Sequence, residues 1–413
     1  MGAGNNYRVE ISDRCIQCGM CAEYCGFGVL VLVENFIQVR PTGCSGCGAC
    51  AEVCPEQAIR IVPVEPSQRQ EAGVAVPLTD LREFVMAVLL RIGVPEDEAS
   101  IVTASLLEAD LRGTSSHGVA RLAGYIKRIR LGLMQAATDF KVEKQSGVVV
   151  VCDAGNGWGQ VAGLRAMELC IKSAKRYGVG VATVKRSNHF GLASFYTLAA
   201  SRAGLIGLVM SNTGPSMAAW GGKTPVLGTN PISVAAPAPW GEFCLDMALT
   251  TVAKSRIRLA GKEGHEIPPT WALDEFGRPT TDPTIALKGT LQPAGGAKGY
   301  AAALLVDLLS GVLSGGAYAT DVRGSMDSSG LANVGQFVAA LDPVFFLGSE
   351  EWEQRLTDWA AKIKVDQGDV RIPGERAEAA RSRNAVHGIS IGPKTRDELS
   401  LLATELGLTV PWK

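Results

Sequence analysis

The apolar side chains at the start of the long region after residue 76 repeat with the period of a helix. Between residues 77 and 112, Leu81, Val85 and Val88 recur every three to four positions, which places them on one face of an α-helix. Pro95 is followed by three acidic residues, a composition typical of a helix's first turn. The pattern therefore predicts that this region begins with helices.

The middle of the chain alternates between strands and helices. Short β-branched runs at 148–151 and 179–184 have the composition of strands, and the alanine-rich stretch 160–177 between them has that of a helix. Further helices are predicted from about 299 to 313 and from 395 to 406. The chain is thus expected to be a multidomain α+β and α/β protein.

Cysteine usage marks a separate N-terminal module. Eight of the eleven cysteines fall between Cys15 and Cys54, and the polar stretch 64–73 contains Pro66 but no apolar period, as a linker does. The changes in composition and periodicity along the chain divide it into five predicted parts. These are a cysteine module at 1–65, a linker at 66–76, a helical part at 77–150, a central part at 151–345 and a helical C-terminal part at 346–413.

Composition argues against several classes of partner. With 40 basic and 41 acidic side chains the net charge is -1, so nothing in the total favours nucleic acid or an anionic membrane. The longest apolar stretch, from Tyr300 to Ala319, is interrupted by Asp307, so we interpret it as a buried helix and not as a membrane span. No export signal is visible, and Asn6 stands where a myristoylation motif requires Ser or Thr, so a cytoplasmic protein without a lipid anchor is expected.

The cysteine module contains two copies of one pattern. Each copy has the spacing Cys-x2-Cys-x2-Cys-x3-Cys, and the second begins 29 residues after the first, at Cys44 instead of Cys15. This spacing puts three thiolates on a tight loop around one iron–sulfur cube, while the fourth crosses to the other cube. One [4Fe-4S] cluster is therefore expected on Cys15, Cys18, Cys21 and Cys54, and the other on Cys44, Cys47, Cys50 and Cys25.

Disulfides and zinc fit these cysteines less well than iron–sulfur clusters do. A disulfide framework needs an oxidising compartment that nothing indicates, and zinc sites use pairs of Cys-x2-Cys and not two such quartets. Residues 8–63 resemble the bacterial two-cluster ferredoxins. Gly26 stands where that family usually has proline, whereas Pro55 is present after the second quartet.

The region after residue 76 carries no dinucleotide fingerprint of the G-x-G-x-x-G type, because the glycines at 155–159 have the wrong register. It carries instead a series of short motifs: Arg112-Gly113-Thr114-Ser115-Ser116-His117-Gly118-Val119-Ala120-Arg121, Asn188-His189-Phe190-Gly191, Gly228-Thr229-Asn230-Pro231, Asp246-Met247-Ala248, Lys298-Gly299-Tyr300 and Pro373-Gly374-Glu375-Arg376. In their order and spacing these motifs resemble the type 2 malate/L-lactate dehydrogenase family over residues 77–413. That family also includes ureidoglycolate, sulfolactate and diketogulonate enzymes and cyclic ketimine reductases.

The resemblance implies a fold and an activity. The fold would be a non-Rossmann nicotinamide-binding domain on a mixed or antiparallel sheet, beside a helical substrate lobe formed from both ends of the region. The activity would be that of an NAD(P)-dependent 2-hydroxyacid dehydrogenase, or a 2-oxoacid or ketimine reductase, acting on a small carboxylate. A homodimer with active sites near the subunit boundary is also implied.

Hydride chemistry on a carbonyl needs a proton donor or acceptor, and histidine is the side chain best matched to that task near neutral pH. His117 is the first candidate because Ser116 precedes it and Arg121, four residues on along an expected helix, can hold a substrate carboxylate. His189 follows the strand 179–184, resembles the acid/base residue of some family members and is the second candidate. His265 and His387 are interpreted as surface or loop residues.

The resemblance assigns the cofactor contacts to Thr213, Asp246, Met247, Ala248, Lys298, Gly299 and the turn Pro373-Gly374-Glu375. Lys298 before a long helix can place charge near phosphates, and Gly299 allows close approach. Asp246 could alternatively orient a catalytic histidine or cap a helix. The sequence does not discriminate NAD from NADP, nor one family substrate from another.

The fusion of the two modules leaves three interpretations open. A cluster moves one electron and a hydride carries two, so the chain is first interpreted as an enzyme with an electron port and a redox protein partner. It could alternatively be an electron-transfer subunit with the dehydrogenase body as docking scaffold. The clusters could also stabilise the N-terminus, because their ligation contributes folding free energy.

Overall fold

A computed structural model describes residues 7–12, 14–25, 29–33, 36–39, 44, 49–63, 74–262, 264–325, 327–365 and 370–412. Residues 66–73 of the predicted linker and the predicted ligand Cys47 lie outside these described residues. The chain divides into two units: Met1–Ala75 with Ser390–Lys394, and Val76–Ile389 with Thr395–Lys413.

The first unit repeats one small arrangement twice. Strand β1 (Tyr7–Ile11) pairs antiparallel with β4 (Ile59–Pro63), and β2 (Leu30–Val33) pairs antiparallel with β3 (Phe36–Val39). The short helices α1 (Met20–Tyr24) and α2 (Ala49–Glu52) each carry a cysteine of one quartet and contact one another. Its small core combines aliphatic side chains with thiols: Val9, Val29, Leu30, Ile59, Cys21, Cys44 and Cys50.

The second unit is organised around a seven-stranded sheet in the order β13-β12-β9-β16-β8-β7-β6. The strands are β6 (Lys141–Ser146), β7 (Val149–Asp153), β8 (Val179–Ser187), β9 (Ile206–Ser211), β12 (Ile232–Ala238), β13 (Gly241–Met247) and β16 (Val334–Leu341). Strands β7 and β8 are parallel, and every other neighbouring pair is antiparallel. The sheet is therefore mixed.

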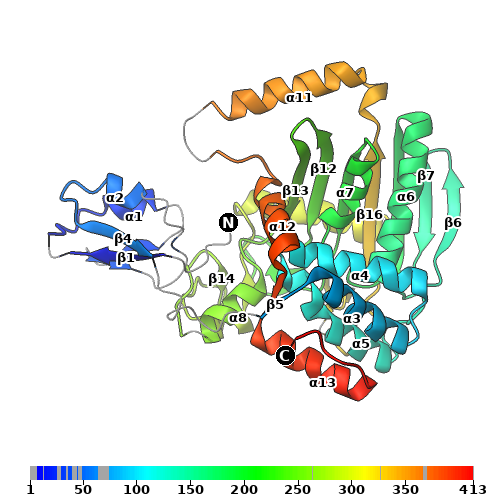
Figure 1. The fold of residues 1–413 in the computed structure, drawn as a ribbon, viewed down its shortest axis with the longest axis horizontal. Helices are drawn as coiled ribbons and strands as arrows, with labels where there is room; N and C mark the ends of the chain where they lie inside the picture. Colours follow the sequence, from blue (N-terminus) through cyan, green and yellow to red (C-terminus); the bar gives the residue numbers. More distant parts are fainter. Residues whose placement is uncertain are drawn as a thin grey trace. The chain divides into compact units, whose positions relative to one another are not determined.

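Alternation along the strands divides the core between the two faces of this sheet. Helices α6 (Gly159–Tyr177) and α7 (Ser194–Arg202) cover one face (Figure 1), where Val209 and Val338 join their core. The neighbours Met210 and Phe337 point the other way, toward α10 (Ala297–Asp307). The close approach of α6 needs a residue without a side chain at Gly180, because an added Cβ there would lie 2.3 Å from the Cys170 carbonyl oxygen.

A smaller four-stranded sheet completes the α/β part. Its order is β11 (Pro225–Leu227), β10 (Met217–Ala218), β15 (Thr290–Leu291) and β14 (Ala272–Leu273). Helices α8 (Lys254–Lys262) and α9 (Pro283–Lys288) contact each other beside it, and Ile257, Ile267 and Leu291 share their core.

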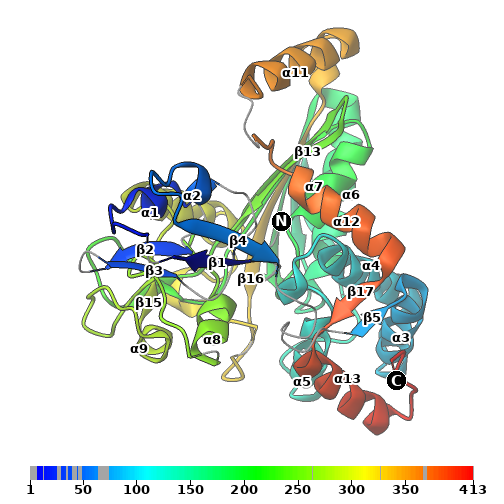
Figure 2. The ribbon, with the colours of Figure 1, turned by 60° about the vertical axis from the view of Figure 1, so that its left-hand side comes forward.

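The remaining helices come from both ends of the region. From the N-terminal end come α3 (Leu78–Arg91), α4 (Glu96–Leu111) and α5 (Leu122–Arg130), and from the C-terminal end α11 (Ser349–Ile363), α12 (Glu375–His387) and α13 (Pro393–Leu406). Helix α12 contacts α4 (Figure 2), and the Phe84 and Trp412 rings meet edge to face at 5.6 Å. Strand β5 (Val74–Val76) pairs with β17 (Ile389–Ile391). Segments about 300 residues apart thus form one helical part.

The prediction that 300–319 is a buried helix is wrong in two respects. Helix α10 ends at Asp307 and gives way to a π-helical turn, Leu308–Val312. One face of this segment is exposed to solvent. Its side chains have 43–59% of their surface exposed: Leu304, Leu305, Leu308, Val312 and Leu313. The number of apolar residues in a segment does not distinguish a helix that the rest of its chain buries from a helix that exposes apolar side chains to solvent. Among the described residues no helix is long and apolar enough to cross a membrane.

Candidate active site

A cavity of about 860 Å³ lies in the second unit, at one edge of the large sheet. Because β8 and β9 are both antiparallel to β16, their carboxyl ends lie at the edge where β16 begins. The antiparallel pairings of β12 bring the end of β13 to the same edge. The loops that follow these strands therefore converge on one cavity, although they are far apart in the sequence.

Most of the predicted site residues line this cavity. They are Ser116, His117, Arg121, His189, Thr213, Asp246, Ala248, Pro373 and Gly374. Met247, Lys298, Gly299 and Glu375 are not among its lining residues. Lys298 is exposed in the first turn of α10, and Gly299 is needed for packing, since an added Cβ would lie 1.9 Å from the Ala294 carbonyl oxygen.

His117 stands on a tight turn and not on the regular helix that was expected. Two successive 3-10 turns, Ser115–His117 and Val119–Arg121, are joined by Gly118. The buried Asp110 carboxylate accepts a hydrogen bond from the Val119 N–H at 2.8 Å and leaves no room for a side chain at Gly118. Burial raises the pKa of Asp110 to about 7. The glycine and the carboxylate together set the backbone that carries His117.

The two candidate histidines lie side by side in the cavity. Their rings are stacked, with centroids 5.5 Å apart and planes at 26°. His117 Nδ1 is 2.9 Å from the Ser116 hydroxyl, and His189 Nδ1 is 2.7 Å from the Tyr125 hydroxyl. The structure thus brings together two residues that belong to distant motifs of the sequence.

The hydrogen bonds of His189 determine its tautomer. The backbone N–H of Gly191 donates to His189 Nδ1 at 3.4 Å, and an N–H cannot act as acceptor. Burial raises the pKa of Tyr125 to about 12, so its hydroxyl keeps its proton and donates to the same nitrogen. The neutral ring of His189 therefore carries its proton on Nε2.

Both histidines are held in the neutral form. Burial, followed by the positive charge of Arg121, lowers the pKa of His117 to about 4. The same two causes, joined by His117 itself, lower the pKa of His189 well below its ordinary value. A neutral imidazole can accept a proton from a hydroxyl group.

Arg121 lies beside the histidine pair. Its Nε donates to the Ser116 carbonyl oxygen at 2.6 Å, and its guanidinium reaches toward Ser325 at 3.5 Å. The segment that carries Ser325 is held by Arg128, which donates to the carbonyl oxygens of Asp327 and Gly330. A cation with remaining donors thus lines the cavity next to two neutral bases.

Asp246 does not orient either histidine. Its carboxylate accepts a hydrogen bond from the Ser194 N–H at 2.7 Å, at the first residue of α7. It therefore caps α7 from strand β13, which contacts that helix, and does not cap a helix at Met247-Ala248 as the sequence suggested. Thr213 is tied to the motif loop at 228–231, since the Thr229 N–H donates to its hydroxyl at 2.9 Å and its own N–H donates to Asn230.

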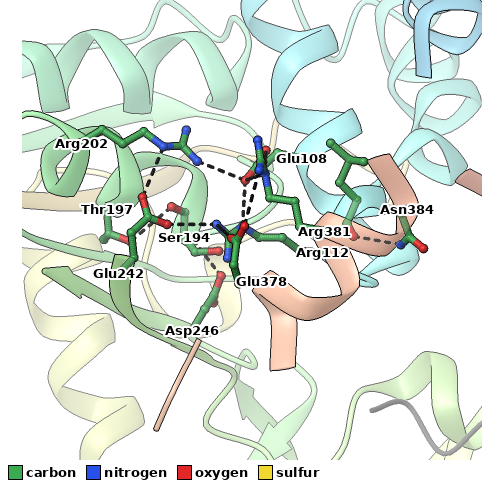
Figure 3. Close-up of polar contacts among 11 residues, drawn as sticks. Glu108, Arg112, Ser194, Thr197, Arg202, Glu242, Asp246, Glu378, Arg381 and Asn384 are labelled. Atoms are coloured by element: carbon green, nitrogen blue, oxygen red, sulfur yellow. Dashed lines mark hydrogen bonds and ion pairs between the residues drawn. The ribbon is translucent and has the colours of Figure 1, made fainter. Parts of the chain in front are cut away.

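Sequence reasoning missed the ion-pair network behind the cavity. Arg112 contacts three carboxylates, Glu108 at 2.8 Å, Glu378 at 3.1 Å and Glu242 at 3.2 Å, which come from α4, α12 and β13 (Figure 3). Arg202 of α7 joins through Glu108 and Glu242. Arg112 stands in the motif that contains His117, but its partners are up to 266 residues away, so no local pattern could indicate them.

Four cysteines of the first unit lie near one another. The pKa of Cys21 is raised by burial and then by the nearby thiols of Cys15, Cys18 and Cys54. These are the members proposed for the first cluster, including the fourth ligand from the second quartet. The Val29 N–H donates to Cys25 Sγ at 3.3 Å and the Ala58 N–H to Cys54 Sγ at 3.2 Å. In the described part of the chain no three Cys, His, Asp or Glu side chains are close enough to share a single ion.

Comparison with protein families accounts for almost the whole chain. Residues 76–400 match the malate/L-lactate dehydrogenase model, and residues 14–58 match the 4Fe-4S dicluster domain model. The second match begins just before Cys15 and ends just after Cys54, so it contains both cysteine quartets.

Individual relatives resemble the second unit. The L-sulfolactate dehydrogenase of Methanocaldococcus jannaschii is 37% identical over 80% of this chain and 96% of its own. Its solved structure has a TM-score of 0.78 and covers 82% of this chain and 98% of that chain. The (2R)-3-sulfolactate dehydrogenase (NADP(+)) of Chromohalobacter salexigens is 35% identical over 79% of this chain and 98% of its own. The ureidoglycolate dehydrogenase (NAD(+)) of Escherichia coli is 34% identical over 75% of this chain and 90% of its own.

Proposed function

The chain belongs to the malate/L-lactate dehydrogenase family and carries an N-terminal 4Fe-4S dicluster domain, and we propose that it interconverts a small 2-hydroxy acid and its 2-oxo acid with NAD or NADP. The observation that carries the proposal is the pair of stacked neutral histidines beside Arg121 in one cavity. Small acids with a second anionic group, such as malate and sulfolactate, are the substrates that the names of the family and of the relatives suggest first. A cyclic ketimine is the alternative substrate.

The nicotinamide supplies or accepts the hydride when it is bound. Arg121 holds the substrate carboxylate, and His117 takes the proton of the substrate hydroxyl in oxidation and returns it in reduction. A carboxylate on Arg121 offsets the positive charge that lowers the pKa of both imidazoles, so substrate binding makes His117 a better proton carrier. His189, with its proton on Nε2, donates a hydrogen bond to the reacting oxygen.

Thr213, Ala248 and the turn at Pro373-Gly374 are proposed as cofactor contacts, because all line the cavity. Asp246 contributes by holding the start of α7 in place. Met247, Lys298, Gly299 and Glu375 are assigned no direct contact.

A homodimer is proposed from the exposed face of α10 and the turn after it. Five Leu and Val side chains at 304–313 are about half exposed, and burying them yields roughly 1 kcal/mol each. In a symmetric pair the face occurs twice, giving on the order of 10 kcal/mol against a comparable cost of association. Light scattering on the purified chain measures the assembly.

For the dicluster domain we propose the ligand sets Cys15, Cys18, Cys21, Cys54 and Cys44, Cys47, Cys50, Cys25. Bound clusters supply one-electron transfer. A redox protein partner is the proposed source or destination of these electrons. The complete cavity with its histidine pair favours an enzyme over an electron-transfer subunit with an inert scaffold.

The test is an anaerobic screen of 2-hydroxy acids, 2-oxo acids and cyclic imines with both nicotinamides, on the full chain and two variants. His117→Ala should lower turnover by roughly 10²-fold or more with little change in nicotinamide affinity, the scale of a lost general acid or base. If His189→Ala abolishes turnover while His117→Ala only weakens substrate binding, the two roles are exchanged. If no 2-hydroxy acid, 2-oxo acid or imine reacts, the proposed function is wrong.

A further inference from the structure

The cavity has a strong excess of positive charge. Seven of its lining side chains are Lys or Arg and two are Asp, and the part of the chain that the structure describes contributes no glutamate to the lining. A site with this balance attracts a polyanion. The strength of that attraction depends on how much of the positive charge the protein itself compensates.

Several of these cations already have partners. Arg112 is bound by three glutamates, Arg121 is the proposed carboxylate site, Arg323 has Asp327 nearby, and Arg371 has Glu375 nearby. Three remain: Lys254 and Arg258 on the first turns of α8, and Arg376 on the first turn of α12. Within the described ranges none of these three forms an ion pair with a carboxylate.

Lys254 and Arg258 repel each other. They are one helical turn apart, and the pKa of Lys254 is lowered by partial burial and then by the charge of Arg258. Two like charges beside a cavity, without a compensating carboxylate in the described structure, raise the free energy of the empty protein. Anionic groups of a ligand bound beside these two side chains remove that cost.

The two carboxylates that line the cavity are both held by serine residues. NAD-selective sites commonly use Asp or Glu to accept hydrogen bonds from the ribose 2′-hydroxyl, whereas NADP-selective sites place Arg near the 2′-phosphate. Here Asp246 is bound by the N–H and hydroxyl of Ser194, and Asp327 by those of Ser329. Both carboxylates thus already accept hydrogen bonds from the protein, and no other acid of the described residues lines the cavity.

From this balance we infer that the enzyme prefers NADP(H) over NAD(H), with Arg258 and Arg376 as the residues that select the 2′-phosphate and Lys254 serving the pyrophosphate. The inference rests on the proposed function, because it assumes a nicotinamide dinucleotide in this cavity. A pyrophosphate carries one charge on each phosphate, and the 2′-phosphate adds close to two more at neutral pH. The three cations without a described carboxylate partner carry more positive charge than the two negative charges of the NAD pyrophosphate require.

The test measures dissociation constants of NADPH and NADH for the full chain by nucleotide fluorescence, at low and high salt. NADPH should bind roughly tenfold tighter or more, and the ratio should shrink as salt screens the charges. Arg258→Gln and Arg376→Gln should each move the ratio toward one, and Arg258→Lys should retain part of it. Arg355→Gln, which removes an exposed arginine of α11, is the matched control and should leave the ratio unchanged.

The possible results separate the inference from the proposed function. Binding of both nucleotides with equal affinity, or tighter binding of NADH, overturns the inference and leaves the proposed function standing. An NADPH preference that survives the Arg258→Gln, Arg376→Gln double variant also overturns the assignment. If neither nucleotide binds at millimolar concentration, the proposed function fails as well. Competition by 2′-AMP but not by 5′-AMP would locate the selectivity at the 2′-phosphate.

Discussion

Replacing Gly118 by alanine should destabilise the second unit and disable the histidine pair together. The added Cβ would lie 2.0 Å from Asp110 Oδ1, so the turn or the carboxylate must move. Moving the turn displaces His117, and moving the carboxylate breaks its 2.8 Å hydrogen bond from Val119. The backbone itself does not require glycine, because φ is -88°. The prediction therefore depends on the clash alone.

The expected loss of stability combines two contributions. Overpacking a buried site costs about 1–3 kcal/mol, and a lost hydrogen bond to a buried charged group costs about 1.5–3 kcal/mol. Their sum, about 2.5–6 kcal/mol, corresponds, for a unit of this size, to a fall in the unfolding temperature of roughly 5–20 °C. Pulse proteolysis at pH 8, which does not require reversible refolding, measures the change.

Two further variants make the measurement specific. Gly348→Ala is the control, because no atom lies within 4 Å of its added Cβ and its φ of -66° suits alanine; its effect should stay within about 0.5 kcal/mol. Asp110→Ala removes the obstructing carboxylate, so adding Gly118→Ala to it should cost less than about 1 kcal/mol. If Gly118→Ala alone is as stable as the parent, or if its cost is the same in both backgrounds, the proposed clash does not govern the turn.

Three other predictions concern Asp110 and the N-terminal module. An acid whose folded pKa is raised, here from 3.8 to about 7, contributes full stability below pH 3.8 and loses it as pH rises through 7. Asp110→Asn should therefore gain stability relative to the parent between pH 4 and 8, by on the order of 2–4 kcal/mol; a flat difference would show that the carboxyl titrates normally. Anaerobically purified chain should contain about eight iron and eight acid-labile sulfide, whereas four would mean that one quartet is unused. Residues 75–413, confirmed as folded, should keep nicotinamide-linked turnover and lose exchange with one-electron dyes; a truncation that binds nicotinamide but is inert would show that electrons must pass through the clusters.

The family and the cluster module were both predictable from the sequence. The quartets are local, since a cluster takes three ligands from one tight loop, and the dehydrogenase motifs are short strings that can be recognised without a structure. The helices and strands predicted at 77–112, 148–151, 160–177 and 179–184 are confirmed by α3, α4, β7, α6 and β8, because periodicity depends on neighbours a few residues apart.

The partners of individual side chains depended on the tertiary structure. That His117 stacks on His189, that Asp246 caps α7, and that Arg112 binds three glutamates all follow from strand pairing and helix docking between distant segments. The sequence prediction was wrong for the outward apolar face after residue 303, because hydropathy measures how apolar a residue is and not what covers it. Local patterns determined which elements and which chemistry the chain contains. Only the tertiary structure, through strand pairing and helix docking, decided which charges meet in the cavity, since electrostatic and hydrogen-bonding energies depend on distances in space and not on separation along the chain.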